Sequence, residues 1–181
     1  QVGASRGVYC MSARRRAMRA CHYDISIEGD SGHATVGLGT LVDADGNGDL
    51  ALFDARARAK RTQRLAFTAK PTPLNPRGVC ALLAPSPVAH LGWDAPGDAR
   101  VLVPIEPVYN KRTRRAELSF GGRATIASTK NLQLRARDAT KMSFLLGKTS
   151  NARFSVDLSP PLSPVTAFAL ALAVFEEAVP R

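Results

Sequence analysis

The sequence is poor in cysteine, in aromatic residues and in acidic residues. Its three cysteines, Cys10, Cys21 and Cys80, are far apart and lack the close Cys/His spacing of a zinc site. Their odd number and wide spacing predict reduced thiols in an intracellular protein. Aromatic residues make up only 6% of the chain. They do not alternate with the basic clusters, as they do in proteins that stack single-stranded nucleic acid, so nucleic acid is an unfavoured partner.

Acidic residues are outnumbered by basic residues, 15 to 25, which gives a formal net charge of +10 at pH 7. This balance favours an acidic partner, either a phospholipid surface, an acidic protein face or nucleic acid. With 181 residues, the chain is long enough for one domain with a substantial core.

The chain also lacks the short motifs of common catalytic sites. It contains no HExxH, no P-loop and no GxGxxG sequence. Residues 29–33 (GDSGH) resemble the nucleophile segment of serine proteases, but a catalytic triad also needs a base and an orienting acid in a particular fold. A glycine-rich turn explains this segment better. We therefore predict that the protein is not an enzyme and has no catalytic residue, cofactor or small-molecule substrate.

Residues 43–50 (DADGNGDL) resemble the start of a calcium-binding loop. Position twelve of such a loop would be Asp54, however, where the motif has a bidentate glutamate, and the flanking segments resemble strands rather than helices. A hairpin turn with Asn47 and Gly48 in left-handed conformations fits better, so we predict no metal site and keep calcium as the alternative.

The longest apolar run lies near the C-terminal end, between Pro164 and Phe175. Ser163 can cap a helix there, and Pro164 fits the first helical position. The run is apolar on every face until Glu176, which predicts an enclosed helix over about residues 163–177. Its length of about 18 Å is short of a bilayer core of about 30 Å, so a membrane anchor is only the alternative.

Upstream of this helix, short apolar segments alternate with Gly, Pro, Asn and Asp. Their spacing predicts an antiparallel barrel or sandwich, and a sheet closed around an apolar helix would have no free edges. The predicted fold is therefore mainly β, a closed antiparallel barrel threaded by a hydrophobic C-terminal helix. The candidate strands are residues 23–27, 34–42, 49–53, 64–68, 79–83, 100–103, 116–120, 123–127, 131–136, 141–146 and 152–157.

The first 22 residues form a separate basic arm in this interpretation, and the barrel domain spans residues 23–178. The arm carries five arginines and no acidic residue, which resembles an organelle transit sequence or its remnant. A basic arm that lies on a partner is the alternative. We expect an intracellular protein peripheral to a membrane, with a plastid or mitochondrion as the suspected organelle.

Two blocks of sequence resemble the C-terminal domain of the tubby family. The first is EPVYN followed by LSFGGRATIASTKNLQL, and the second is FLLGK, FSVD and the helical AFALAL. They occupy residues 106–110, 118–134, 144–148, 154–157 and 167–172. The resemblance implies a closed twelve-stranded antiparallel barrel threaded by a hydrophobic helix. It also implies a non-enzymatic role, because family members bind phosphatidylinositol 4,5-bisphosphate at membranes and link other proteins to them. A role on DNA has been proposed for them as well.

The lipid site of that family uses a lysine and an arginine two positions apart on one strand. In this chain the corresponding positions are Leu38 and Thr40, and neither carries the charge that a phosphate head group needs. The resemblance therefore predicts the family's fold without its lipid-binding residues.

Basic clusters remain the best candidates for partner binding. We predict a binding or scaffold module, an accessory or structural subunit that docks through these clusters onto an acidic, membrane-associated and organellar complex. Direct binding to phosphoinositide or other anionic membranes is the alternative, and nucleic-acid binding is a weaker one. The predicted partner-binding residues are Arg14, Arg15, Arg16, Arg19, Arg56, Arg58, Lys60, Arg61, Lys111, Arg112, Arg114 and Arg115.

Overall fold

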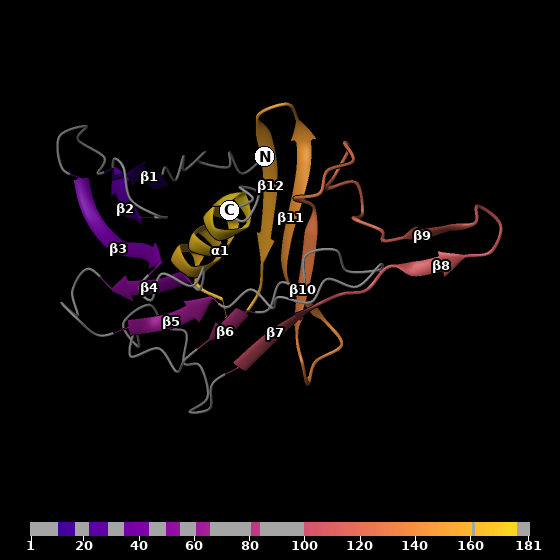
Figure 1. The fold of residues 1–181 in the computed structure, drawn as a ribbon, viewed down its shortest axis with the longest axis horizontal. Helices are drawn as coiled ribbons and strands as arrows, with labels where there is room; N and C mark the ends of the chain where they lie inside the picture. The colour runs from indigo at the N-terminus through magenta and orange to yellow at the C-terminus, as the bar shows by residue number, and fades with distance from the viewer. Residues whose placement is uncertain are drawn as a thin grey trace, which may run out of the picture.

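The computed structural model describes residues 11–16, 22–28, 35–43, 50–54, 61–65, 81–83, 100–160 and 162–176. Within these ranges the chain is mainly β, with a single α-helix near the C-terminal end (Figure 1). In the part of the chain that is described, no helix is long and apolar enough to cross a membrane.

Ten strands form one antiparallel sheet in the order β1-β2-β3-β4-β5-β6-β7-β10-β11-β12, and β8 pairs only with β9 among the described strands. Each strand of the large sheet up to β7 therefore lies beside its neighbour in sequence. The bounds are β1 (Met11–Arg15), β2 (His22–Glu28), β3 (Thr35–Asp43), β4 (Leu50–Asp54), β5 (Arg61–Leu65), β6 (Ala81–Leu83), β7 (Arg100–Pro104), β8 (Val108–Asn110), β9 (Arg115–Glu117), β10 (Leu132–Ala136), β11 (Met142–Ser150) and β12 (Arg153–Leu158).

The helix α1 (Pro164–Glu176) starts as the sequence predicts. The hydroxyl of Ser163 accepts a hydrogen bond from the backbone N–H of Thr166 at 3.1 Å, so Ser163 is the N-cap. Pro164 occupies the first helical position, where its missing N–H costs no hydrogen bond. The predicted span of residues 163–177 agrees with the observed helix to within one residue at each end.

Helix α1 lies between the two ends of the large sheet and contacts β3 and β4 on one side and β12 on the other (Figure 1). Most of its side chains are buried in the core cluster, among them Leu170 and Val174. Val165, Phe168 and Leu172 are only partly buried, and their spacing places them along one side of the helix. The helix is therefore enclosed, as predicted, except along the side that carries these three residues.

The closed barrel is only partly confirmed. The mainly β composition and the apolar central helix agree with it, whereas β1 and β12 are the end strands of the sheet. No ladder joins these two strands within the described ranges. Closure of the sheet stays a prediction.

Strand β1 lies within residues 1–22, the predicted basic arm. It pairs with β2 along its whole length, from Met11 opposite Ile27 to Arg15 opposite Tyr23. Met11 and Ala13 are partly buried, whereas Ser12 and Arg14 are exposed. This alternation is that of a strand with one face on the core, and Arg14 at an outward position and Arg15 at the end of the strand hide it in the sequence.

Several predicted strands differ from the structure. β5 begins three residues before the candidate 64–68, β11 runs four residues beyond the candidate 141–146, and β8 matches no candidate. Residues 123–127 form no strand, because the N–H groups of Thr125 and Ile126 both donate to one carbonyl oxygen, that of Lys148. β9 ends at Glu117, so the candidate 116–120 is shorter than predicted. The strands β3 and β4, on either side of the segment that resembles a calcium-binding loop, pair in antiparallel fashion, with Asp43 opposite Leu50. The proposed turn at Asn47 lies outside the described residues.

Candidate functional site

The predicted partner-binding residues divide into three groups in the structure. Arg14, Arg15 and Arg16 lie at β1, Arg61 begins β5, and Lys111, Arg112, Arg114 and Arg115 lie in the β8–β9 hairpin. The remaining four, Arg19, Arg56, Arg58 and Lys60, lie outside the described residues.

Two arginines of the first group are engaged in ion pairs within the domain. Arg15 Nη2 lies 3.3 Å from Glu176 Oε2, which ties β1 to the end of α1. Arg16 Nε lies 2.6 Å from Asp24 Oδ2 on the neighbouring strand β2. Because both guanidinium groups already have carboxylate partners, this group offers less net charge to a partner than its sequence indicates.

Within the described part of the chain, the β8–β9 hairpin is the predicted basic site whose residues are all placed. It extends away from the large sheet as a two-stranded ribbon (Figure 1), with Val108 opposite Glu117 and Asn110 opposite Arg115. The turn that joins its strands comprises residues 111–114. Asn110 Oδ1 accepts hydrogen bonds from the backbone N–H groups of Arg112 and Thr113, at 2.9 and 3.3 Å.

Backbone conformation fixes the last residue of this turn. Arg114 has a φ of 55°, in the left-handed region that residues other than glycine seldom adopt. The side-chain hydrogen bonds of Asn110 hold the preceding peptide groups, as asparagine commonly does in turns.

The single acidic residue of the hairpin is also held inside it. Glu117 accepts hydrogen bonds from the hydroxyl of Thr113 and from Asn110 Nδ2, the latter at 2.8 Å. These two bonds, first that of Thr113, lower the pKa of Glu117 below its ordinary value, because they favour the charged carboxylate. Glu117 is thus occupied by neutral donors of its own hairpin.

The four basic side chains of the hairpin are exposed, and none of them forms an ion pair with a described residue. Two apolar side chains beside them are also exposed, Val108 at 74% and Tyr109 at 59%. A ribbon tip with uncompensated cations and an exposed aromatic ring is a surface that favours contact with an acidic partner.

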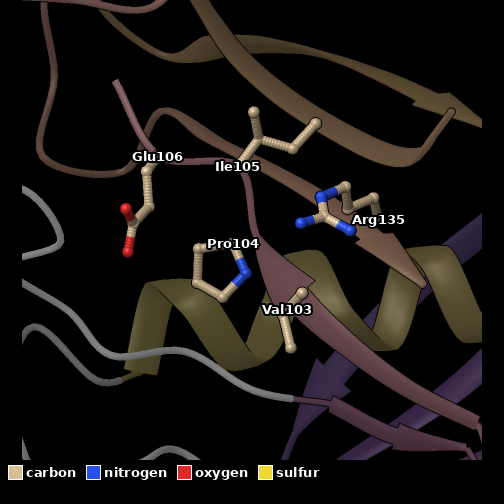
Figure 2. Close-up of a pocket in the computed structure, with 5 residues that line it drawn as sticks. All are labelled: Val103, Pro104, Ile105, Glu106 and Arg135. Carbon is tan, nitrogen blue, oxygen red and sulfur yellow. The ribbon is translucent and has the colours of Figure 1, made fainter. Parts of the chain in front are cut away.

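A hollow of about 550 Å³ lies where the hairpin leaves the large sheet (Figure 2). We call it the hairpin-base hollow, and the described residues that line it are Val103, Pro104, Ile105, Glu106 and Arg135. Val103 and Arg135 are opposite each other in the ladder between β7 and β10 and so share one face of the sheet. The backbone N–H of Ile105 donates to the carbonyl oxygen of Gln133 at 2.9 Å, which fixes the chain at this point.

Arg135 is a candidate that the sequence analysis missed. Its guanidinium points toward the hollow (Figure 2), and Nη1 donates to the carbonyl oxygens of Ala136, Arg137 and Ala139, at 3.4, 3.3 and 2.8 Å. It forms no ion pair with any described carboxylate. The available signal was the single charged residue in the strand sequence LQLRA.

At the positions that correspond to the family's lipid site, the structure offers no cation. Leu38 packs against the core, and the Thr40 hydroxyl lies 3.4 Å from Asp24 Oδ1. The same carboxylate forms the ion pair with Arg16, so this cation close to Thr40 is already compensated. Among the described residues, no cluster of His, Cys, Asp or Glu side chains could hold a metal ion.

These features define a mainly β domain with a large antiparallel sheet packed on one apolar C-terminal helix. The family model described as the Tub family matches residues 53–177, and the chain belongs to this family. The resemblance seen in the sequence is thereby confirmed.

Individual relatives match a shorter part of the chain. It is 36% identical over 77 residues to Tubby-related protein 4 of Homo sapiens, which covers 42% of this chain and 5% of that protein. It is 41% identical over 71 residues to Protein king tubby of Drosophila sechellia and to that of Drosophila yakuba, covering 39% of this chain and 16% of each relative. The matched region is therefore a small part of the relatives' length.

Proposed function

We propose that this protein is a non-enzymatic binding module that docks onto an acidic partner through the tip of the β8–β9 hairpin. The observation that carries the proposal is the cluster of Lys111, Arg112, Arg114 and Arg115, exposed and without carboxylate partners among the described residues. Membership in the Tub family supports a binding role. The partner we propose is the acidic face of a larger, membrane-associated assembly inside an organelle. The protein would be an accessory subunit of that assembly.

The charge of the hairpin tip is suited to such docking. Each lysine or arginine near an anionic surface adds about 1 kcal/mol of attraction, which salt screens over about 8 Å at physiological ionic strength. Because Glu117 is held by Asn110 and Thr113, it does not immobilise a cation of the tip. The side chain of Tyr109, exposed beside the tip, adds apolar contact area of the kind enriched at protein interfaces.

Direct binding to an anionic membrane is the second candidate. The same Tyr109 favours it, because tyrosine is also enriched where membranes meet water. Both candidates need the cations of the tip. They differ in whether the purified protein alone binds lipid vesicles.

The test removes three cations of the tip in one variant, Lys111→Gln, Arg112→Gln and Arg114→Asn, which we call the hairpin variant. Asparagine is chosen at position 114 because it tolerates the left-handed backbone there. A control variant, Arg137→Gln, Lys141→Gln and Arg153→Gln, removes the same charge from exposed positions elsewhere.

Each tagged protein is purified natively from the source cells in mild detergent, and its co-migrating proteins are quantified by mass spectrometry. A cross-linker at position 112 identifies the surface that the hairpin touches. We expect the parent and the control variant to migrate stoichiometrically in one complex, with cross-links to aspartate- or glutamate-rich segments, and the hairpin variant to migrate alone. Retention of the hairpin variant in the complex, or cross-links to basic segments, would contradict the proposal.

The second candidate is tested by co-sedimentation with vesicles of phosphatidylcholine and phosphatidylserine at about 0.15 M salt. Binding by the parent and the control variant, but not by the hairpin variant, would favour the membrane over a protein partner. Absence of binding by all three proteins would exclude it.

A further inference from the structure

We propose that the hairpin-base hollow binds a carboxylate group of the docked partner, with Arg135 as the residue that recognises it. This inference rests on the proposed function, because the carboxylate is supplied by the same acidic partner that contacts the hairpin tip. It adds a second contact, in a partly shielded hollow, to the exposed cations of the tip.

Hydrogen bonds to the backbone orient the guanidinium of Arg135 and leave some of its donors available for such a ligand. Its Nη1 donates to three backbone carbonyl oxygens, the shortest of these bonds being 2.8 Å to Ala139. Among the described residues, Nε and Nη2 have no hydrogen-bond partner. One side of the planar group is therefore fixed, and the other retains the two parallel donors that a carboxylate accepts.

The walls of the hollow strengthen this interaction. Val103, Pro104 and Ile105 place apolar atoms beside the guanidinium, and Arg135 itself is partly buried. An ion pair formed there is less screened by water than one at the exposed hairpin tip. The hollow thus favours one defined, partly shielded pair over diffuse attraction.

Glu106 makes the hollow selective between anions. Its exposed carboxylate lies across the hollow from Arg135 (Figure 2), and the two form no ion pair with each other. A phosphate group, which carries close to two charges at neutral pH, is attracted more strongly than a carboxylate to Arg135 but is also repelled more strongly by Glu106, so its second charge brings little gain there. We therefore assign the hollow to carboxylate rather than phosphate.

One partner segment can reach both contacts. Glu106 lies five positions before Lys111 in the chain, a distance of about 17 Å for an extended backbone at about 3.3 Å per residue. An extended acidic segment of six or so residues would span it. The hollow then sets the position of the segment, and the tip adds charge attraction.

The experiment is an NMR titration of the whole protein with three probes. It follows the Nε–H signal of Arg135, which is assigned because it disappears in the Arg135→Lys variant. The probes are N-acetylglutamate methylamide, its neutral isostere N-acetylglutamine methylamide, and inorganic phosphate. We expect a saturable shift with the glutamate probe, and binding weaker by about tenfold or more with the glutamine probe, since a hydrogen bond to a charged group is lost. Phosphate should also bind more weakly than the glutamate probe.

Two variants separate recognition by Arg135 from its structural role. Arg135→Lys keeps the positive charge but loses the planar pair of donors. Because this variant has no guanidinium signal, its binding is followed through the backbone N–H signals of Val103 and Ile105, and the affinity for the glutamate probe should fall about tenfold. Because that variant also loses bonds to backbone carbonyls, Ile105→Trp provides a second test. It fills the hollow, leaves Arg135 in place and should abolish the saturable shift.

Equal binding of the glutamate and glutamine probes would overturn the inference, as would a tighter or equal affinity for phosphate. So would unchanged binding in the Ile105→Trp variant, or no response to any probe. The hairpin variant should bind the glutamate probe as the parent does. Failure of the hollow to bind and failure of the tip to dock are therefore separate results.

Discussion

The ammonium group of Lys130 lies 3.1 Å from the carbonyl oxygen of Phe175 and 4.8 Å from the centre of the Phe175 ring. It also lies 3.4 Å from the carbonyl oxygen of Val174. The last turn of α1 contains no basic residue of its own, so Lys130 supplies from outside the helix the positive charge that its C-terminal end favours. Phe154 of β12 packs edge-on against the same ring, with centres 4.9 Å apart.

Replacing Lys130 by Met should therefore destabilise the domain. The substitution removes the cation at the helix end and over the ring, and we expect a loss of about 1–2 kcal/mol in the free energy of unfolding. Urea denaturation measures it. Lys141→Met, at an exposed lysine elsewhere, is the control and should change stability by about 0.5 kcal/mol at most. Equal effects of the two substitutions would show that the contacts of Lys130 do not stabilise the helix end.

Gly147 on β11 allows residues 123–126 to lie directly against the sheet. A Cβ atom there would come within 2.6 Å of the carbonyl oxygen of Arg123 and 3.0 Å of the Ala124 Cβ atom. We expect Gly147→Ala to cost about 1–3 kcal/mol in thermal or urea unfolding, because a backbone atom must move. Adding Ala124→Gly should restore little of this loss. Full recovery in the double variant would identify the Ala124 side chain, not the Arg123 carbonyl, as the cause.

How much of this structure could be predicted depends on whether the determining contacts are local. The helix start at Ser163 and Pro164 was predicted, because capping chemistry is encoded within a few residues. Strand β1 was missed, because its pairing with β2 depends on residues beyond its own arginine-rich segment. Periodicity alone did not show that residues 123–127 bond irregularly to β11.

The same difference between local and distant contacts decides how much of the candidate site could be predicted. The positive charge of the site could be predicted from the cluster Lys111–Arg115. Which cations form ion pairs within the domain could not be predicted, since Arg15 pairs with Glu176, a residue 161 positions away. Arg135 was missed for a similar reason. Its role depends on the neighbouring strand β7 and on carbonyl groups whose orientation no sequence pattern states.

Two leucines of α1 test the partial enclosure of the helix. Leu170 is fully buried, whereas Leu172 lies on the partly buried side. Leu170→Ala should leave a cavity and lower the free energy of unfolding by about 2–5 kcal/mol. Leu172→Ala removes the same atoms from a less enclosed place and should cost clearly less. Urea denaturation of both variants compares them, and equal losses would mean that α1 is enclosed on every side.

The hydrogen bonds of Glu117 predict that the order of the hairpin depends on pH. The folded hairpin lowers the pKa of Glu117. The stability that the Glu117 carboxylate gives to the hairpin is therefore complete above the ordinary pKa of a glutamate, about 4.3. It is lost as the pH falls through the lower pKa of the folded state, since the protonated group is a poorer acceptor. An NMR titration of the Glu117 carboxyl carbon measures this pKa directly. Thr113→Val removes the strongest of the causes and should raise the pKa toward the ordinary value. An unchanged pKa in that variant would mean that the Thr113 hydroxyl does not hold the carboxylate in solution, and the tip would then lack the constraint that keeps Glu117 away from its cations.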